Sequence, residues 1–325
     1  MKLALCIVGC GQFARTFVQG LQPVWDDLDL FFASRDVARA RAYAAQFQGC
    51  GAFGSYEAAA ADPRVEAMYL CTPHHLHQAH VVLAAQAGKH ILVEKPIART
   101  LAEGRAMIAA AQQAGVTLMV AENARFMAAV RQCKALIAQG GVGDLRVVQL
   151  HEETPFQPGH WRSRRDLNGG GVFIDSGIHK VHLLRYLAGE PAHLYAAALP
   201  QALAQHEGED GMVVMTRGAS GVVGVIHHAW TCSNRPCPPW VAVSGTRGRI
   251  AFEVGAPWLR LEQGSTERTW QCADDASGLI PMVQAFRDSI RAGQEPEMSG
   301  AEGLRDLGVV LKAYESMAQG VSLPL

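Results

Sequence analysis

The feature that most constrains this chain is an apolar segment that runs directly into a glycine-containing turn, residues 3–14 (LALCIVGCGQFA). The last six of these residues follow the pattern G-x-G-x-x-A, which between a strand and a helix is typical of a dinucleotide-binding turn. Gly9 permits the tight turn, and Gly11 lets a pyrophosphate approach the backbone. Gln12 and Phe13 then open a helix whose N-terminal amides attract anions. Because an ordinary strand-turn-helix explains the motif alone equally well, the surrounding sequence decides between the two.

The composition fits a folded protein that binds a small molecule. The 325 residues are enough for two domains of ordinary size, and 49% hydrophobic against 18% charged residues are typical of folded cores. A formal net charge of −1 provides no broad attraction for nucleic acid or an anionic membrane. The N-terminus has one lysine before a short apolar strand, which fits neither a signal peptide nor a membrane span. We therefore expect a cytoplasmic protein with no nucleic-acid or membrane partner.

The eight cysteines are scattered, and several lie in apolar segments where a free thiol behaves as a small hydrophobic group. They do not form a disulfide framework. Cys232 and Cys237 are close in sequence, but no second cysteine or histidine pair accompanies them at zinc-ligand spacing. No cluster of histidine, aspartate and glutamate stands out at metal-ligand spacing either. The sequence therefore predicts no metal site.

The first 120 residues alternate short apolar runs with alanine-rich helical segments. Strands that alternate with helices form βαβ units, so this pattern predicts a doubly wound parallel sheet. The expected strands cover residues 3–8, 29–33, 66–71, 90–93 and 116–120. The expected helices cover residues 12–21, 36–47, 76–88 and 100–114.

From about residue 145 the pattern changes to hairpins. Turn sequences at 216–221 and 244–248 lie between alternating strands, which predicts a mostly antiparallel sheet. These strands are expected at 222–228, 240–243 and 249–254, and two closing helices near 280–292 and 301–318. We therefore predict an α/β protein with two domains, 1–121 and 122–325, and a boundary near 121–125.

The end of the second expected strand indicates which dinucleotide is bound. A site selective for NAD usually places an acidic residue here to bind the ribose 2′-hydroxyl. In this chain the strand leads into Ser34, Arg35 and Asp36, and Arg39 lies one helical turn beyond Arg35. The hydroxyl and the two guanidinium groups suit a 2′-phosphate, whereas Asp36 is close enough to serve a NAD site. We expect NADP and keep NAD as the alternative.

Two further segments follow expected strands at the edge of the sheet where ligands bind in open α/β folds. The first contains Thr72, Pro73 and His77, and the second is the tripeptide 94–96 (EKP). A lysine beside a positively charged nicotinamide has a lowered pKa and can exchange a proton with a substrate hydroxyl. A structural ion pair is the alternative role for Lys95.

Together these motifs give the chain a resemblance to the Gfo/Idh/MocA family of oxidoreductases, which includes glucose-fructose oxidoreductase and inositol dehydrogenase. Its most specific motif is the Glu-Lys-Pro tripeptide 94–96. The similarity continues through 169–179 (GGGVFIDSGIH), which resembles the D-x-G-x-H element of the family, and so covers nearly the whole chain. The resemblance implies a Rossmann domain followed by an α/β domain whose large open sheet commonly mediates oligomerisation. We accordingly expect a homo-oligomer, a dimer or a tetramer.

Asp175 and His179 stand four residues apart, a spacing that places two side chains on one face of a helix. Histidine titrates near neutral pH, so His179 can take the proton of an alcohol while Asp175 orients the substrate or the imidazole. Lys95 can stabilise the developing oxyanion. The resemblance to inositol dehydrogenase implies Lys95, Asp175 and His179 as catalytic and substrate-binding residues. Without the other motifs, a surface ion pair would be the simpler interpretation of the Asp/His pair.

The resemblance also implies further contacts. Those with the cofactor, beyond the glycine turn and the residues that suit a 2′-phosphate, involve Thr72, Pro73, His77, Glu94, Lys95, Asn123, Trp161 and Arg162. Arg125 is implied at the substrate, with a seal between domains as its alternative role. Lys180 and His182 are more polar than the residues that relatives often have at these two positions. We expect His151, His182 and His227 to be satisfied core histidines, as lone histidines on apolar strands and helices usually are.

We therefore expect an NAD(P)-dependent oxidoreductase that interconverts a hydroxyl and a carbonyl on a sugar, a cyclitol or a related polyol. Two other functions fit the same fold. One is an enzyme that keeps its nicotinamide tightly bound and uses transient oxidation for glycoside cleavage or epimerisation. The other is a non-catalytic sensor that binds NADP and a partner protein. The presence of Lys95, Asp175 and His179 argues against the sensor, which has no chemical need of all three.

Overall fold

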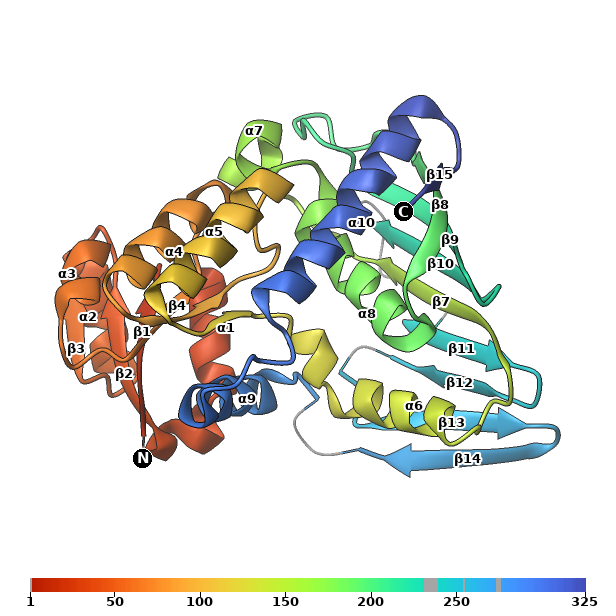
Figure 1. Cartoon of the computed structure of the whole chain (residues 1–325), viewed down its shortest axis with the longest axis horizontal. Helices are drawn as coiled ribbons and strands as arrows, with labels where there is room; N and C mark the ends of the chain where they lie inside the picture. Colours follow the sequence, from red (N-terminus) through yellow and green to blue (C-terminus); the bar gives the residue numbers. More distant parts are fainter. Residues whose placement is uncertain (1, 231–238, 254, 273–275) are drawn as a thin grey trace. The chain divides into compact units, whose positions relative to one another are not determined.

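The computed structural model describes residues 2–230, 239–253, 255–272 and 276–325. The chain divides into two units, each with its own sheet (Figure 1). The first unit contains Met1–Glu122 and Leu279–Arg305, and the second contains Asn123–Gly278 and Asp306–Leu325. The segment Leu279–Arg305, which the sequence places in the second domain, groups with the first unit.

The sheet of the first unit has six parallel strands in the order β3-β2-β1-β4-β5-β6. This order confirms the predicted doubly wound sheet. The strands are β1 (Leu3–Val8), β2 (Leu28–Ala33), β3 (Gly51–Phe53), β4 (Ala67–Leu70), β5 (His90–Val93) and β6 (Leu118–Val120). The helices are α1 (Gln12–Gly20), α2 (Val37–Gln46), α3 (Tyr56–Ala61), α4 (His77–Gln86), α5 (Leu101–Ala114) and α9 (Leu279–Ala292).

The central strands form because their sequences are apolar throughout. Every residue of β4 is buried, as is every residue of β1 except Ala4, which is partly exposed. Strands covered by helices on both faces need such continuous apolar runs. Tyr69 of β4 stacks on Phe17 of α1 with ring centroids 4.0 Å apart, which joins one covering helix to the middle of the sheet.

Side-chain caps set the helix boundaries of this unit. The Thr100 hydroxyl accepts a hydrogen bond from the amide of Glu103 at 3.2 Å and starts α5, and Gly115 ends it at a φ of 65°. Ser55 caps α3 in the same way, at 3.1 Å from the amide of Ala58. The sequence does not predict α3 or β3, because segments of six and three residues are too short to show a periodic pattern.

The second unit contains a nine-stranded sheet in the order β14-β13-β12-β11-β7-β10-β9-β8-β15. Its neighbouring strands are antiparallel except for the parallel pair β7 and β10, which confirms the mostly antiparallel sheet. The strands are β7 (Leu145–Glu153), β8 (Pro191–Ala198), β9 (Gly211–Gly218), β10 (Val223–Ala229), β11 (Val241–Gly245), β12 (Arg249–Phe252), β13 (Trp258–Gln263), β14 (Thr266–Gln271) and β15 (Leu323–Pro324). The two predicted turns join β9 to β10 and β11 to β12.

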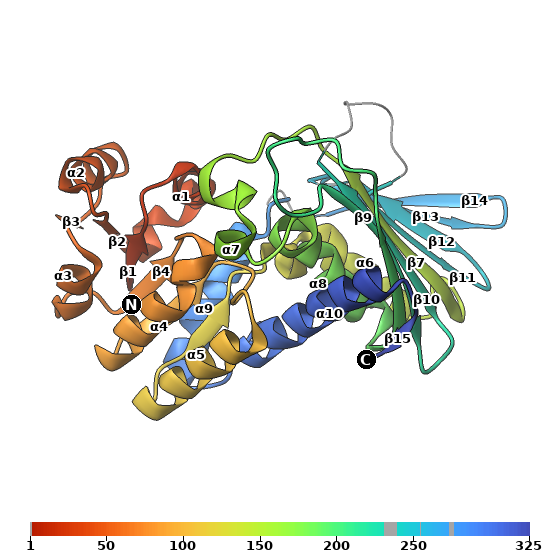
Figure 2. The same cartoon turned by 90° about the horizontal axis from the view of Figure 1, so that it is seen from above.

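Helices cover one face of this sheet, as Figure 2 shows. They are α6 (Ala128–Ala138), α8 (Ile178–Ala188) and α10 (Gly300–Gln319), of which α10 begins in the first unit and ends in the second; the short α7 (Arg165–Asn168) precedes α8. Burial alternates along β7: Val148 and Leu150 are buried against the helices, whereas Gln149 is exposed. The opposite face of the sheet bears no helix among the described residues.

Two further expectations concern membrane-spanning helices and the cysteine pair Cys232 and Cys237. None of the described helices combines the length and the apolar character that crossing a membrane requires. Cys232 and Cys237, the closest cysteine pair of the second domain, lie outside the described residues.

Candidate functional site

The glycine turn after β1 has the geometry that a dinucleotide phosphate requires. Gly9 adopts a φ of 96°, and a Cβ there would lie 2.5 Å from the carbonyl oxygen of Cys71. A Cβ at Gly11 would meet no atom of the chain within 4 Å, so the protein itself does not demand glycine at this position. Gly11 is also the N-cap of α1 and provides no side-chain cap for the helix amides. The turn therefore fits a bound pyrophosphate, whose oxygens would accept hydrogen bonds from those amides.

The residues after β2 differ in how free they are to meet a ribose. Asp36 caps α2, because its Oδ1 accepts from the amides of Ala38 at 3.0 Å and Arg39 at 3.3 Å. The buried Ser34 hydroxyl accepts from the amide of Asp36 at 3.2 Å. Arg35 lies beside the Tyr56 hydroxyl: burial raises the pKa of Tyr56, and the guanidinium opposes that rise. The Asp36 carboxylate thus caps a helix, whereas the Arg35 guanidinium lies at the end of β2, where a ribose would bind.

His77 joins the two strand-end segments. Its Nε2 lies 2.8 Å from the carbonyl oxygen of Thr72, and its Nδ1 lies 3.0 Å from that of Pro96 and 3.2 Å from that of Ile97. The side chain is fully buried, and this burial lowers its pKa. The ring fixes the loop after β4 against the loop after β5. The expected contact of His77 with the cofactor stays a prediction.

The second of these loops begins with Glu94 and Lys95. Glu94 is buried and hydrogen-bonded to the hydroxyl of Tyr69. Burial raises the pKa of Tyr69 well above its usual value, and the Glu94 carboxylate adds to the rise. Lys95 is partly exposed, and its peptide bond to Pro96 is cis. The adjacent buried Glu94 and the His77 bonds hold the backbone on both sides of Lys95.

Asp175 and His179 lie in the second unit. Asp175 is in a π-helical turn, Phe173–Gly177, which leads directly into α8. The expectation of one regular helix through both residues is wrong, since α8 begins only at Ile178. Asp175 is 4% exposed, whereas His179 is partly exposed in the first turn of α8. A π-helical turn is rare and is frequently found at functional sites.

Arg162 neutralises the buried carboxylate of Asp175. Its Nε donates to Asp175 Oδ2 at 3.0 Å, and its guanidinium lies over the Trp161 ring at 4.6 Å from the centroid. A buried carboxylate needs such a partner. The sequence implies Trp161 and Arg162 at the cofactor; within this unit they form a pair that holds Asp175.

The glycine triplet before Asp175 makes room for a partly buried hydrogen-bond network. The Tyr314 hydroxyl accepts from the amides of Gly171 and Ile174, both at 3.1 Å, and donates to Glu209 Oε1 at 3.1 Å. The same Oε1 accepts from the amide of Phe173 at 2.7 Å. A Cβ at Gly171 would clash with the backbone of Glu209, so the close approach expected of these glycines is made to the protein's own chain. Burial raises the pKa of Glu209 to about 7.

The polar residues Lys180 and His182 of α8 have internal partners. Lys180 is buried, forms an ion pair with Glu152 of β7, and lies 5.5 Å from the centroid of the Trp240 ring. His182 is buried, with its Nδ1 2.9 Å from Asp306 Oδ2. Packing within the second unit thus explains the polarity of both residues. His182 is nevertheless not the satisfied core histidine that was expected, because its Nε2 is buried without a hydrogen-bond partner among the described residues.

His206 is a residue near Asp175 that the sequence does not single out. Burial lowers its pKa, and the carboxylates of Asp210 and Asp175 oppose this effect. Its ring lies 5.6 Å from that of Trp230, whose Nε1 donates to the Ser176 hydroxyl at 3.1 Å. His206 lies in a loop without any motif, so no sequence signal could have identified it.

Asn123 and Arg125 follow the end of the first unit. Asn123 Nδ2 donates to the carbonyl oxygen of Ser277 at 2.8 Å, and the Arg125 guanidinium lies 4.6 Å from the centroid of the Tyr186 ring. Both partners belong to the second unit, which also contains Asn123 and Arg125. Their expected roles at the cofactor and the substrate stay predictions.

His151 and His227 are not the satisfied core histidines that the sequence predicts. The Nε2 atoms of both are buried and make no hydrogen bond. Together with Glu153 they form a group whose side-chain atoms could hold a metal ion, all within 4.8 Å of one another. This group does not stand out in the sequence, because strand pairing brings together residues that are far apart in the chain.

Comparisons with known proteins give the chain a family. A family model described as an oxidoreductase family with an NAD-binding Rossmann fold matches residues 3–122, and the model of the GFO/IDH/MocA C-terminal domain matches residues 130–251. The chain is 30% identical to a 1,5-anhydro-D-fructose reductase of Ensifer adhaerens over 97% of this chain and 96% of that protein. It is 35% identical to a trans-1,2-dihydrobenzene-1,2-diol dehydrogenase of Mus musculus, over 78% and 75%.

Solved structures agree with this assignment. An aldose-aldose oxidoreductase from Caulobacter crescentus, complexed with glycerol, superposes with a TM-score of 0.90 at 27% identity and covers 100% of both chains. A levoglucosan dehydrogenase in complex with NADH and levoglucosan has the same fold, with a TM-score of 0.91 at 22% identity over 100% of this chain and 99% of that one. With both domain models matched and a relative 30% identical along nearly its whole length, the chain belongs to the Gfo/Idh/MocA family of NAD-binding oxidoreductases.

Proposed function

We propose that this enzyme interconverts a hydroxyl and a carbonyl on a sugar, a cyclitol or a related polyol, with NADP as its favoured cofactor. The names of the two relatives, a reductase of an anhydrosugar and a dehydrogenase of a diol, describe this redox change in opposite directions. The direction in this enzyme then depends on which form of the substrate and cofactor is supplied.

The observation that supports this proposal best is the buried Asp175, held by Arg162 and followed one turn later by the partly exposed His179. We assign to His179 the acceptance of the proton that an alcohol loses as it is oxidised, because imidazole titrates near neutral pH. Asp175 orients the substrate hydroxyl or the imidazole. The Arg162 bond to Oδ2 holds the carboxylate in place for that task.

Lys95 completes the proposed catalytic set. Its ammonium group would stabilise the negative charge that develops on the substrate oxygen as the proton leaves. The fully buried His77 and the buried Glu94 hold its loop, so the lysine backbone is fixed before substrate arrives. The nicotinamide, when bound at the glycine turn, supplies the acceptor or donor of hydride.

The preference for NADP follows from the partners of Asp36. A NAD site needs a carboxylate that accepts from the ribose hydroxyls. Asp36 Oδ1 already accepts from two amides of α2, whereas Ser34, Arg35 and Arg39 offer a hydroxyl and two positive charges to a 2′-phosphate. Arginine suits phosphate because its fork donates two parallel hydrogen bonds.

Titration calorimetry with NADPH and then NADH tests the cofactor proposal. We expect tighter binding of NADPH, and Arg35→Ala should weaken NADPH binding on the order of tenfold while it changes NADH binding little, as loss of a charged hydrogen bond of ~1.5 kcal/mol would do. Arg41→Ala is the matched control, since Arg41 is an exposed arginine of α2, the helix that follows Arg35. Equal loss of both nucleotides in Arg35→Ala would contradict the preference for NADP.

The purified protein used for calorimetry also distinguishes a dehydrogenase with an exchangeable cofactor from an enzyme that keeps its nicotinamide bound. If nucleotide is released only on denaturation, the enzyme that uses transient oxidation becomes the better interpretation, and a product without net redox change would support it. If the protein binds neither nucleotide and releases none, the proposed function is wrong.

A screen of sugars and polyols with Lys95→Met and His179→Asn tests the catalytic roles. Each variant should lose 10²- to 10⁴-fold in kcat, the range typical of a proton-transfer residue, with NADPH affinity retained. His193→Asn, an exposed histidine of β8, is the control for the substitution itself. If both catalytic variants keep wild-type turnover and ligand response, the catalytic assignment fails.

We also propose a cytoplasmic homo-oligomer in which the helix-free face of the second sheet is buried. Tyr195 and Met215, opposite each other on β8 and β9, are 39% and 52% exposed, and Val225 of β10 continues the row. Exposed apolar rows of this kind are typical of association surfaces. Met215→Lys should lower the mass measured by light scattering if the proposal holds.

A further inference from the structure

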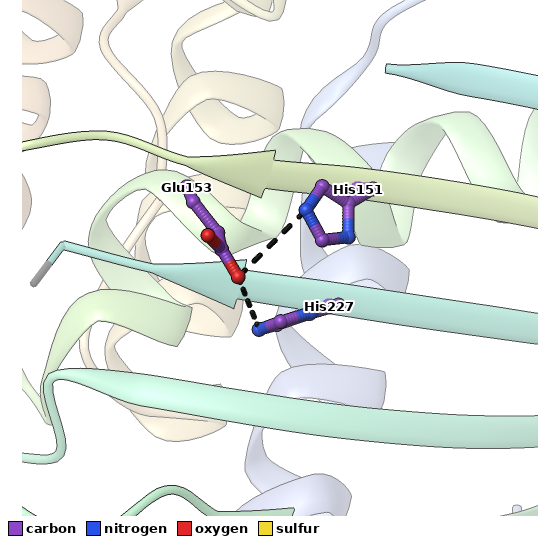
Figure 3. Close-up of side chains that lie close together, drawn as sticks. All are labelled: His151, Glu153 and His227. Atoms are coloured by element: carbon purple, nitrogen blue, oxygen red, sulfur yellow. Dashed lines mark ion pairs between the residues drawn. The ribbon is translucent and has the colours of Figure 1, made fainter. Parts of the chain in front are cut away.

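Two histidines and a glutamate lie together on the second sheet, as Figure 3 shows. His151 and Glu153 belong to β7, and His227 belongs to β10, where it is the register partner of His151. We refer to these three residues as the His-Glu cluster. Glu152, between two of them, is directed at Lys180 of α8. Because alternate residues of a strand point to opposite faces, the His-Glu cluster lies on the face away from α8.

The distances within the His-Glu cluster suit a metal ion better than a direct ion pair. Glu153 Oε1 lies 3.3 Å from His227 Nε2 and 3.8 Å from His151 Nε2. Both separations exceed the usual length of a charge-assisted hydrogen bond. Two ligands that each lie 2.0–2.1 Å from a tetrahedral zinc ion are about 3.3 Å apart. The first pair already has this spacing, and the second needs to close by about half an ångström. The two histidine nitrogens lie within 4.8 Å of each other and would approach further around the ion.

The two imidazole nitrogens that face the Glu153 carboxylate have no hydrogen-bond partner in the described part of the chain. His151 Nε2 and His227 Nε2 are buried and form no hydrogen bond in the described part of the chain, and the three side chains are only 16%, 26% and 22% exposed for His151, His227 and Glu153. A buried polar atom without a partner costs free energy. Coordination of a cation would satisfy both nitrogens at once.

We propose that the His-Glu cluster binds a divalent first-row transition metal, with zinc as the cation that fits its donors best. His151 and His227 provide Nε2, and Glu153 provides a carboxylate oxygen. Two nitrogens and one carboxylate match zinc sites with three protein ligands and one open position, which water fills. Magnesium and calcium prefer all-oxygen sites and fit this donor set poorly. No group in the chain has to be oxidised or reduced.

The position of the site separates it from the residues proposed for catalysis. Asp175 precedes α8, and the Ser176 hydroxyl next to it contacts Nε2 of His228, a residue of β10 that faces the helices. The His-Glu cluster is on the opposite face of the same strands. The metal would join β7 to β10, the one parallel pair of the described sheet, without contact with the residues proposed for catalysis.

Metal binding by the untagged full-length protein tests this proposal. After dialysis against a chelator and its removal, we expect one zinc ion per chain in calorimetry at pH 7.5, a higher Tm with zinc, and visible absorption bands of a tetrahedral site with cobalt. Loss of an outer partner of a metal ligand typically costs 10- to 100-fold in affinity, so His227→Gln and Glu153→Gln should each weaken zinc binding on the order of 100-fold or more.

His193→Gln is the matched control, because it removes an exposed histidine of the same sheet outside the His-Glu cluster. It should bind zinc like the wild type. Circular dichroism of each metal-free variant checks that the fold is retained, and His151→Gln provides an independent second ligand variant. Failure of the wild type to bind zinc at one ion per chain, or equal binding by His227→Gln and the wild type, would overturn the proposal. Neither result bears on nucleotide binding, so it is independent of the proposed function.

Discussion

The partly buried Glu209 makes the stability of this protein depend on pH in a predictable direction. Burial raises its pKa to about 7 from a usual 4.5, although the amide of Phe173 and the hydroxyl of Tyr314 both donate to Oε1. Between these two values the folded protein binds the proton and the unfolded chain does not. Stability due to this group is therefore complete below pH 4.5 and is lost as the pH rises through about 7.

The size of the effect follows from the same values. A difference between 4.5 and about 7 corresponds to ~3 kcal/mol at about 1.4 kcal/mol per pKa unit. Glu209→Gln imitates the protonated acid: its Oε1 keeps both hydrogen bonds, and its amide nitrogen takes the place of the protonated oxygen. We expect the variant to match the wild type near pH 4.5 and to exceed it by ~3 kcal/mol in unfolding free energy at pH 8.

Urea unfolding at intervals from pH 4.5 to 8 measures this difference directly. Groups that titrate in both proteins, such as His77, cancel when the free energy of the variant is subtracted from that of the wild type. Glu267→Gln, at an exposed position of β14, is the control for the removal of one carboxylate. A difference between Glu209→Gln and the wild type that stays constant across this range would refute the reasoning, because the carboxyl would then titrate alike in the folded and unfolded states.

Three further predictions concern stability and selectivity. Thr100→Ala should lower the unfolding free energy by about 1 kcal/mol in urea denaturation, because it removes the cap that accepts from the amide of Glu103; an unchanged value would contradict the capping role. Gly170→Ala should cost about 1–3 kcal/mol, since its Cβ would clash with the Tyr314 hydroxyl, and wild-type stability would show that the segment can shift. Asp36→Ala should lower the Tm through loss of a helix cap but leave the ratio of NADPH to NADH affinity unchanged in calorimetry; a changed ratio would return Asp36 to the ribose.

The fold was predictable because its elements have local causes. The apolar run of β1 and the turn at Gly9 determine the start of the Rossmann sheet, and the hairpins of the second sheet follow from their turn sequences. The assignment of α9 to the first unit was not predictable, since it depends on packing between segments far apart in the chain. One such contact is that of Leu279 with Gly20 of α1, where a Cβ would lie 2.8 Å from the leucine side chain.

Residues of the candidate site could be predicted where they belong to a sequence motif. Contacts between segments that are distant in the sequence could not. Lys95, Asp175 and His179 stand in recognisable motifs, but the bond of Arg162 to Asp175 depends on a loop conformation that no spacing reveals. The His-Glu cluster depends on the register of β7 with β10. A parallel pair formed by strands so distant in sequence leaves no local pattern.

The histidines show why residue type alone does not define a site. His77 is enclosed by backbone carbonyls, and His182 is paired with Asp306, so both are committed to structure. His228 contacts the Ser176 hydroxyl behind the segment that contains Asp175. His179 differs from these because it is partly exposed in the first turn of α8. Exposure and neighbours, which the fold determines, therefore favour His179 over the buried histidines as the residue that exchanges a proton with substrate.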